Sequence, residues 1–263
     1  MFRKYFSLLK NTEKALSFKE WRKLKSMPRY TPVETKLYGV VIKSNDSCTL
    51  LGDIDGILNK GVYQFMSESS RPVIVDCGAN IGMSIVYFKR LYPGAKIIAF
   101  EPDPNLFDIL SCNIDSFMFN DIELVQKALW VHNDGVLFDV EGGHSGAIHM
   151  QGQNDNNTVK VQSIRLKDVL CEYEKIDMLK IDIEGAENEV IFDCDNELSR
   201  CDHIFIEYHS RNGSEQRLHE ILYLLNKLNY RYHIHEAFTR YQPFVDRNCM
   251  VGMDLQLNLF FYK

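Results

Sequence analysis

Apolar positions in the middle of the chain alternate between short runs and helical spacing. Val73 to Val75 form a β-branched run, and the residues after a loop at 77–82 have a helical pattern, at Met83, Val86, Tyr87 and Arg90. Residues 96–100 form the next apolar run, which ends at Glu101-Pro102. This order predicts a strand, a tight loop, a helix and a second strand, which together form the first half of an open α/β sheet.

The same alternation continues to the end of the chain. Pro104 stands where a helix begins, and apolar residues at helical spacing follow it at Leu106, Ile109, Leu110 and Ile114. Residues 134–164 instead alternate at period two between turn-rich segments, so a β-rich excursion replaces a helix there. The remaining predicted elements are strands at 122–125, 176–185, 203–209 and 230–235, short and long helices at 168–173 and 214–228, and an antiparallel strand at 255–262. We therefore predict an α/β fold with a mostly parallel sheet.

The first 70 residues have a different character. Residues 1–36 hold ten Lys or Arg against three Glu, a net charge of +7, whereas the whole chain has a net charge of −6. Their apolar residues allow one or two amphipathic helices, and residues 37–70 are expected to form a small β-rich lead-in with a strand at 37–42 and a turn at 44–47. We divide the chain into this extension, residues 1–70, and a main domain, residues 71–263. The basic segment is interpreted as a helical cap on the main domain; contact with an anionic membrane surface or an acidic polysaccharide is the alternative.

Composition narrows the class of protein. The seven cysteines include no C-x-x-C pair, so neither a disulfide framework nor a zinc site is indicated, and a reducing compartment is the simplest interpretation. The first residues lack the apolar stretch of a signal peptide, and no segment approaches the roughly 18 apolar residues of a membrane span. A cytoplasmic protein is expected, with no nucleic-acid partner; the oligomeric state is not predicted.

The loop after the first strand indicates the kind of ligand. Its sequence is Gly78-Ala79-Asn80-Ile81-Gly82, which lacks the middle glycine of a dinucleotide fingerprint and the Lys-Ser/Thr of a P-loop. A ligand without phosphate fits better, and S-adenosylmethionine is an adenosine with an amino-acid tail and no phosphate. The loop would line that tail, and Glu101 would bind the ribose hydroxyls. A structural turn followed by a chance acid is the alternative.

Two later strands carry polar residues where an apolar run is normal. Lys180, Asp182 and Glu184 fall at period two on one side of the strand at 176–185, and Glu207 and His209 end the strand at 203–209. Buried ionised groups must be paired or face a cleft. A structural ion pair explains Lys180, and a helix N-terminus explains Glu184, whereas Asp182 is a candidate for function.

These motifs, in this order, resemble the FkbM family of S-adenosylmethionine-dependent methyltransferases. The resemblance covers about residues 72–240 and is carried by five segments, at 75–82, 100–104, 144–146, 179–187 and 206–209. It implies a class I methyltransferase sheet of seven strands, with the last strand antiparallel, and methyl transfer to a hydroxyl of a surface-polysaccharide sugar or a natural product.

The resemblance also implies roles for individual residues. The cofactor-binding set would be Asp76, Gly78, Ala79, Asn80, Gly82, Glu101, Pro102, Asp103, Ala128 and Asp182. Asp182 would lie beside the transferred methyl group. His144 and Ser145 are the candidates for contact with a small-molecule or glycan acceptor.

The proton acceptor is not given by the resemblance. Among His209, His144, Glu207, Glu184 and Asp182, a histidine has the unperturbed pKa closest to neutral pH, and we choose His209 as the general base. Asp182, Glu184 and Glu207 complete the catalytic set. A divalent metal held by Asp182, Glu184 and His209 is the weaker alternative, so no metal is predicted. A fold that binds nucleoside without catalysis, as a partner or scaffold, is the other class of function.

Overall fold

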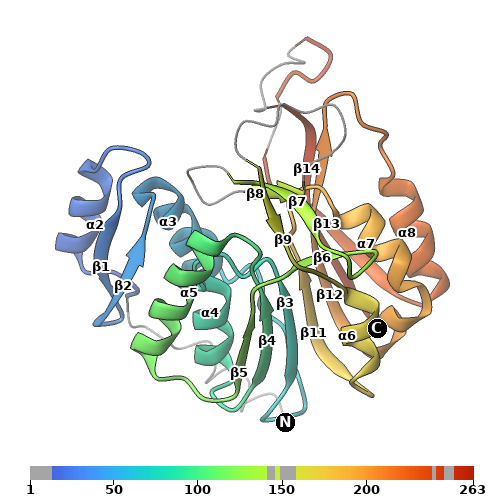
Figure 1. The fold of residues 1–263 in the computed structure, drawn as a ribbon, viewed down its shortest axis with the longest axis horizontal. Helices are drawn as coiled ribbons and strands as arrows, with labels where there is room; N and C mark the ends of the chain where they lie inside the picture. Colours follow the sequence, from blue (N-terminus) through green and yellow to red (C-terminus); the bar gives the residue numbers. More distant parts are fainter. Residues whose placement is uncertain (1–13, 141–145, 149–157, 239–240, 246–251) are drawn as a thin grey trace.

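The computed structural model has the α/β architecture that the sequence predicts. It describes residues 14–140, 146–148, 158–238, 241–245 and 252–263. A central sheet runs through the molecule, with helices on both of its faces (Figure 1). Its strands, in the order β13-β14-β12-β11-β3-β4-β5, are Arg231–Glu236, Met253–Tyr262, Cys201–Arg211, Ile176–Ile181, Val73–Cys77, Lys96–Phe100 and Ile122–Val125.

The direction of the strands is as predicted. β3 pairs in parallel with both β4 and β11, and β11 pairs in parallel with β12. β14 is antiparallel to β12 and β13, between which it lies. The predicted seven-stranded sheet with an antiparallel last strand is therefore confirmed.

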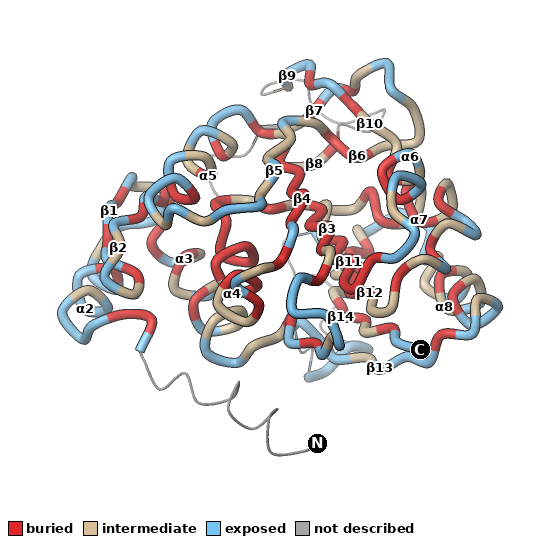
Figure 2. Tube along the Cα trace, turned by 90° about the horizontal axis from the view of Figure 1, so that it is seen from below, coloured by how far each residue is buried: buried red, intermediate tan, exposed pale blue. Residues whose placement is uncertain are grey.

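Alternating residues of the buried strands pack on opposite faces of the sheet. Val75 of β3 belongs to the apolar cluster that contains Val190 and Leu225, whereas Ile74 belongs to the one that contains Ile85 and Leu110. The first face is thus covered by α6 Leu166–Cys171, α7 Glu187–Cys194 and α8 Leu218–Lys227, and the second by α4 Met83–Leu91 and α5 Pro104–Phe117. The short 3₁₀-helix η2 Asp195–Arg200 connects α7 to β12. Figure 2 shows β3, β4 and β11 as the buried centre of this arrangement.

The lead-in is more helical than predicted. It consists of α2 Phe18–Ser26, the hairpin β1 Val33–Leu37 and β2 Val40–Ser44, α3 Ser47–Asp53 and the π-helix η1 Ile54–Asn59. The strand expected at 37–42 is wrong, because Tyr38 and Gly39 have φ values of 49° and 82° and reverse the chain there. The turn expected at 44–47 is present as the bend between β2 and α3, where the Asp46 side chain accepts a hydrogen bond from the Cys48 N–H and caps α3.

The lead-in packs on the main domain as the helical-cap interpretation expects. Leu24 of α2 is buried in a cluster that also contains Leu37, Ile81 and Met83. The division at residue 70 stays a prediction, and these apolar contacts run across it. Among the described residues, no helix has the length and apolar content that crossing a membrane requires.

The β-rich excursion after β5 is present. β7 Val136–Val140 pairs with β8 Gly146–Ile148 and β9 Thr158–Val161, and β6 Ala128–Trp130 pairs with β10 Ser163–Arg165. Phe138 and Ile148 of this excursion line a cavity together with Phe100, Glu101 and Asp182 at the carboxyl ends of β4 and β11.

Candidate active site

Two cavities meet at the carboxyl ends of β3, β4, β11 and β12. The cavity that we call the first cavity lies over β4 and is lined by Gly78, Asn80, Phe100, Glu101, Pro102, Leu106, Lys127, Ala128, Leu129, Phe138, Gly146, Ile148, Asp182, Ile183 and Glu184. The second cavity extends toward the lead-in, and its lining includes Tyr63, Lys180, Glu207 and Asn258. Gly78, Asn80, Asp182 and Glu184 line both cavities, so a group in one can reach a group in the other at this junction.

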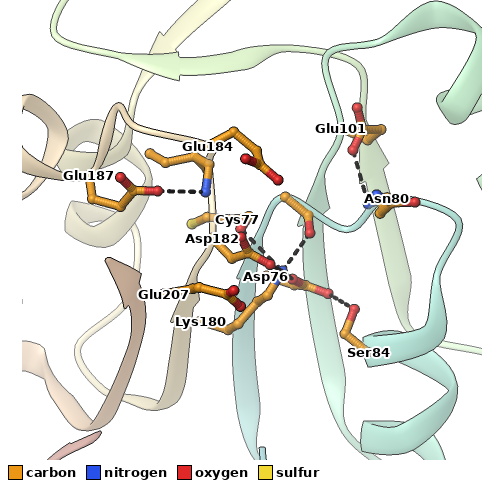
Figure 3. A network of polar contacts seen from close by, with 12 residues as sticks. Asp76, Cys77, Asn80, Ser84, Glu101, Lys180, Asp182, Glu184, Glu187 and Glu207 are labelled. Carbon is orange, nitrogen blue, oxygen red and sulfur yellow. Dashed lines mark hydrogen bonds and ion pairs between the residues drawn. The ribbon is translucent and has the colours of Figure 1, made fainter. Parts of the chain in front are cut away.

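Glu101 has the geometry of a preorganised acceptor in the first cavity. Its residue is 5% exposed, its Oε2 accepts from the Asn80 N–H at 2.9 Å, and its Oε1 accepts from the Asp103 N–H at 2.9 Å (Figure 3). Burial raises the pKa of Glu101 to about 7, although these two N–H donors lower it. Each oxygen keeps a lone pair, so a diol in the cavity can donate to a carboxylate whose position is already fixed.

The glycine loop is shaped by a close approach of two backbones. Gly78 has φ +88°, and a Cβ there would lie 1.9 Å from the Asp182 carbonyl oxygen. Asn80 also has a positive φ, +51°, and its side-chain oxygen accepts from the Ile81 N–H at 2.7 Å. The loop therefore brings the end of β3 against the segment after β11, which forms the cavity junction.

Three residues of the predicted cofactor set line neither cavity. Asp76 is buried and accepts from the Ser84 hydroxyl at 2.5 Å, and Asp103 caps α5 through the Asn105 N–H. Gly82 sits at the start of α4, where a Cβ would be 2.9 Å from the Leu110 side chain. Asp76 thus bonds to other side chains, Asp103 caps a helix and Gly82 allows helix packing. The cavity-lining members of the set are Gly78, Asn80, Glu101, Pro102, Ala128 and Asp182 in the first cavity and Ala79 in the second.

Lys180 joins the two halves of the site. Its side chain is 3% exposed, and Nζ lies 3.3 Å from Asp76 Oδ1 and 3.4 Å from Asp182 Oδ2. Nζ also donates to the Gly78 carbonyl oxygen at 2.5 Å. Burial lowers the pKa of Lys180, but the two aspartates outweigh it and hold the pKa well above its usual value. The predicted ion pair to a neighbouring strand is present, and this lysine is a fixed cation.

The sequence predicted that the strand continues to residue 185, with Lys180, Asp182 and Glu184 on one side, and this prediction is only partly right. β11 ends at Ile181, and Glu184 has φ +56°, outside strand geometry. Asp182 continues the ladder through its N–H, which donates to the Cys77 carbonyl oxygen at 3.0 Å. Asp182 therefore projects from the segment directly after β11, and Glu184 from the turn that follows it (Figure 3).

His209 is held by a buried acid from another element. Its side chain is 1% exposed, and Nδ1 lies 3.0 Å from Glu187 Oε1, whose side chain is fully buried. Burial lowers the pKa of His209, but the charge of Glu187, the hydrogen bond to it and the charges of Glu184 and Asp182 together raise it to about 10. His209 therefore carries a proton at neutral pH, which is opposite to the state that our sequence-based choice of general base requires.

Two carboxylates face the His209 imidazolium. Nε2 lies 3.8 Å from Glu184 Oε2 and 3.9 Å from Glu207 Oε1. Burial raises the pKa of Glu184 and of Glu207 to about 7 each; His209 lowers both values and Asp182 raises them. Because the two acids interact, they titrate as a pair near neutral pH, the range that suits a general base.

The same side chains have a spacing that a cation could use. Asp182, Glu207 and His209 each place one atom of metal-ligand type within 4.8 Å of the others. Nε2 binds either a proton or a metal, so a metal at this place would replace the proton on His209.

The remaining predictions differ in outcome. His144 and Ser145 lie outside the described residues. The sequence interpretation assigned no role to Glu187, Tyr63, Gln256 or Asn258, which the fold brings to the site. Glu187 could have been found because it stands in the same motif as Asp182, whereas Tyr63 and Asn258 come from the lead-in and the last strand with no local signal.

The first cavity suits S-adenosylmethionine by its chemistry. Its charged lining is a buried carboxylate with free lone pairs, two further acids and, among the described lining residues, a single lysine, Lys127. This set favours a diol and a cationic centre over a diphosphate, because acids repel phosphate and attract a sulfonium.

Comparisons with known proteins agree with this site. The model of the methyltransferase FkbM domain matches residues 76–232. The methyltransferase sdnD of Sordaria araneosa is 35% identical over 171 residues, which cover 51% of this chain and 65% of that protein. The 2-O-methyltransferase NoeI of Sinorhizobium fredii is 29% identical over 171 residues, 58% of this chain and 68% of that protein. The matched part thus spans slightly less than two thirds of the first of these relatives.

A solved structure supports the fold. The crystal structure of the methyltransferase FkbM from Methylobacillus flagellatus aligns with a TM-score of 0.50 and 16% identity, covering 75% of this chain and 45% of that chain. The family match covers more than half of the residues here, and it includes the ends of β3, β4, β11 and β12 that form the site. The chain belongs to the FkbM family of S-adenosylmethionine-dependent methyltransferases, and S-adenosylmethionine is its cofactor.

Proposed function

We propose that the chain methylates a hydroxyl oxygen of a small-molecule or glycan acceptor. The observation that carries this proposal is the junction of the two cavities at Gly78, Asn80, Asp182 and Glu184. A methyl donor in the first cavity and an acceptor in the second would meet there, beside acids that titrate near neutral pH.

The cofactor would be held by side chains that are already fixed. Glu101 accepts hydrogen bonds from the ribose hydroxyls, and Ala128 and Pro102 border the space for the adenine ring. When bound, S-adenosylmethionine supplies an electrophilic methyl group on a sulfonium. Asp182 and Glu184, at the junction, favour a positive charge at this place.

Glu207 is the proposed proton acceptor. It lines the second cavity and not the first, whereas Glu184 lines both. Its Oε1 accepts from the Gln256 amide at 2.5 Å, which leaves Oε2 for the acceptor hydroxyl. Glu207 would take the proton of the acceptor hydroxyl as that oxygen is methylated, and the bound cofactor would supply the methyl group and keep the electron pair of the broken sulfur–carbon bond. His209, our first choice from the sequence, would instead act as the cation that keeps this carboxylate ionised.

The second cavity favours an acceptor with several hydroxyl groups. Its inner wall carries Asp182, Glu184 and Glu207, and Asn258 Oδ1 is buried there without a hydrogen-bond partner. A sugar or hydroxylated natural product donates hydrogen bonds to such acceptors, and Tyr63 offers it an aromatic wall. A nucleic acid would bring phosphates against these acids, so we do not propose one as the partner. A cytoplasmic location stays part of this proposal, because soluble donors and acceptors meet there.

Transfer of a labelled methyl group from S-adenosylmethionine to a panel of glycans and nucleotide sugars tests the function. In the variant Glu207→Gln, kcat should fall by about 10²–10⁴-fold, the usual contribution of a general base, while cofactor affinity changes less than about twofold. Asp202→Asn is the matched control, because Asp202 lies on the same strand and pairs with the exposed Lys175. Cofactor binding without transfer to any hydroxyl would favour the scaffold alternative.

Helix α2 supports a second proposal, peripheral contact with an anionic membrane surface. Phe18 and Trp21 are 73% and 40% exposed and stack on each other, with Arg22 and Lys25 over their rings. Exposed aromatics among cations are typical of interfacial helices. Phe18→Ser/Trp21→Ser should weaken sedimentation with phosphatidylserine vesicles; Tyr223→Ser, an exposed aromatic on α8, is the control. Equal sedimentation of both variants would refute the contact.

A further inference from the structure

Glu187 is a fully buried acid beside the site, and one of its oxygens makes three contacts. Oε1 accepts from the Ile183 N–H at 3.2 Å and from the Gly185 N–H at 3.1 Å, and it lies 3.0 Å from His209 Nδ1. The two N–H groups flank Glu184, which the turn holds at φ +56°. A single carboxylate of α7 therefore connects the turn after β11 to the end of β12.

The other oxygen of Glu187 has an unusual environment. Oε2 is buried and has no hydrogen-bond partner, although a buried charge without full hydrogen bonding is costly. The cation that compensates this charge is His209, on the side of Oε1. A neutral side chain at this position would avoid the free-energy cost of a buried charge. The presence of an acid is therefore better explained by its stabilisation of protonated His209 than by packing.

The surroundings of His209 come from four elements. Glu187 of α7 faces Nδ1, and Glu184 of the turn after β11 and Glu207 of β12 face Nε2 at 3.8 and 3.9 Å. The Gln256 amide nitrogen of β14 lies 3.4 Å from Nε2, and Asp182 adds a more distant negative charge. Two fixed cations lie nearby: Arg211 Nη2 donates to the Glu184 carbonyl oxygen at 3.2 Å, and Lys180 is paired with Asp76 and Asp182. The ring is therefore a cation placed between one buried acid and two cavity-lining acids.

We propose that Glu187 is a positioning residue for methyl transfer, which holds the His209 imidazolium with its Nε2–H toward Glu184 and Glu207 and so keeps the proton-accepting carboxylate ionised and in place. This inference rests on the proposed function, because it assigns Glu187 a part in the same reaction. Glu187 acts through His209 and the turn, and it contacts neither cavity.

The first test is the protonation of His209 in the protein without ligands. In ¹⁵N NMR spectra, seven of the eight histidines should titrate independently of Glu187, and His209, identified by the signals missing from His209→Gln, should stay protonated beyond pH 9. In Glu187→Gln, which keeps an oxygen for the two N–H donors, the pKa of His209 should fall by about two units or more. Glu189→Gln makes the same charge change on α7, at an acid that is more exposed than Glu187 and pairs with Arg217, and should leave the pKa of His209 unchanged.

The second test measures the consequence for the facing acids. Loss of the imidazolium should raise the apparent pKa values of Glu184 and Glu207 in ¹³C carboxyl spectra by about one unit or more, and should move the acidic limb of the pH–rate profile upward by the same amount. A purely structural role of Glu187 would lower activity without moving that limb.

The outcomes separate this inference from the proposed function. A neutral His209 in the wild-type protein at pH 7 would overturn the inference, even if Glu187→Gln fails to fold. Carboxyl titrations that do not move when His209 loses its proton would overturn it as well. If the carboxyl titrations move as expected but no hydroxyl acceptor is methylated, the electrostatic coupling stands and the proposed function fails.

Discussion

The cofactor half and the acceptor half of the site use acids differently. At the ends of β3 and β4, Asp76 binds a hydroxyl and a lysine, and Glu101 binds two backbone N–H groups. At the ends of β11 and β12, Glu184 and Glu207 face each other across the His209 imidazolium, with few fixed donors. In the cofactor half the acids are held in fixed positions by hydrogen bonds, whereas in the acceptor half two acids can change their charge.

This difference matches the two tasks of a transferase. A cofactor that every cycle shares is best bound by donors and acceptors whose positions are already fixed, since fixed dipoles need no reorganisation. A proton acceptor must change its charge during the reaction, so its pKa has to lie near the working pH. Lys180 and Gly78 connect the halves, and perturbing either should affect both.

Loss of the central cation should have the largest effect. Lys180→Met leaves Asp76 buried without its counter-charge, and removal of one partner of a buried pair costs about 3–5 kcal/mol. Urea denaturation should show this decrease in the free energy of unfolding. Lys175→Met, at an exposed pair with Asp202, should cost about 1 kcal/mol or less. Equal losses in the two variants would mean that Lys180 does not join the halves.

The second largest effect is expected from adding a methyl group at the junction of the two cavities. Gly78→Ala places a Cβ 1.9 Å from the Asp182 carbonyl oxygen and adds an unfavourable positive φ, so a loss of about 2–4 kcal/mol is expected. Gly213→Ala has a similar φ, +83°, but meets nothing within 4 Å, and should cost about 1 kcal/mol. Thermal denaturation compares the two. If Gly78→Ala is no worse than its control, the two backbones are not in close contact.

Removal of the fixed acceptor should affect only the cofactor half. Glu101→Ala should weaken S-adenosylmethionine binding by roughly 10- to 150-fold, the value of a charge-assisted hydrogen bond of about 1.5–3 kcal/mol. Calorimetry should show this loss, with unchanged affinity in Glu123→Ala, at an exposed acid of the neighbouring strand β5. An unaltered affinity in Glu101→Ala would remove this residue from the cofactor site.

The smallest of these expected effects is the change in cofactor affinity with pH. The pKa of Glu101 without ligand is about 7, and the ribose hydroxyls need the ionised carboxylate as acceptor. Affinity should therefore be constant above pH 7 and fall about tenfold per pH unit below it. Calorimetry between pH 5.5 and 8.5 checks this, and the slope should vanish in Glu101→Ala. A slope that persists in this variant would assign the titration to another group.

The sequence predicted the cofactor half better than the acceptor half. Glu101 and Asn80 stand in one strand–loop–helix–strand unit, whose local pattern fixes where they lie. Asp76 and Gly82 belong to the same unit, but Asp76 forms an ion pair and Gly82 allows close helix packing. The spacing of residues in the sequence does not distinguish these roles from contact with a ligand. The local sequence pattern therefore predicts where these residues lie, whereas their roles depend on contacts with residues that are distant in the sequence.

The charge state of the acceptor half could not be predicted from spacing. His209 and Glu187 are 22 residues apart and meet only because β12 lies beside the turn after β11. An isolated histidine has a pKa near neutral, so the sequence favoured a base, and the buried acid that raises this value became apparent only in the fold. The same holds for Gln256 and Asn258, which the antiparallel β14 brings beside Glu207.

The pH dependence of kcat at saturating cofactor and acceptor tests the central claim most directly. With a carboxylate as the proton acceptor, kcat should rise tenfold per pH unit up to about pH 7 and then level off, with or without a chelator, and this limb should be absent from the residual activity of Glu207→Gln. A limb that survives in Glu207→Gln and disappears in His209→Gln would contradict the account, because it would identify a neutral His209 as the base.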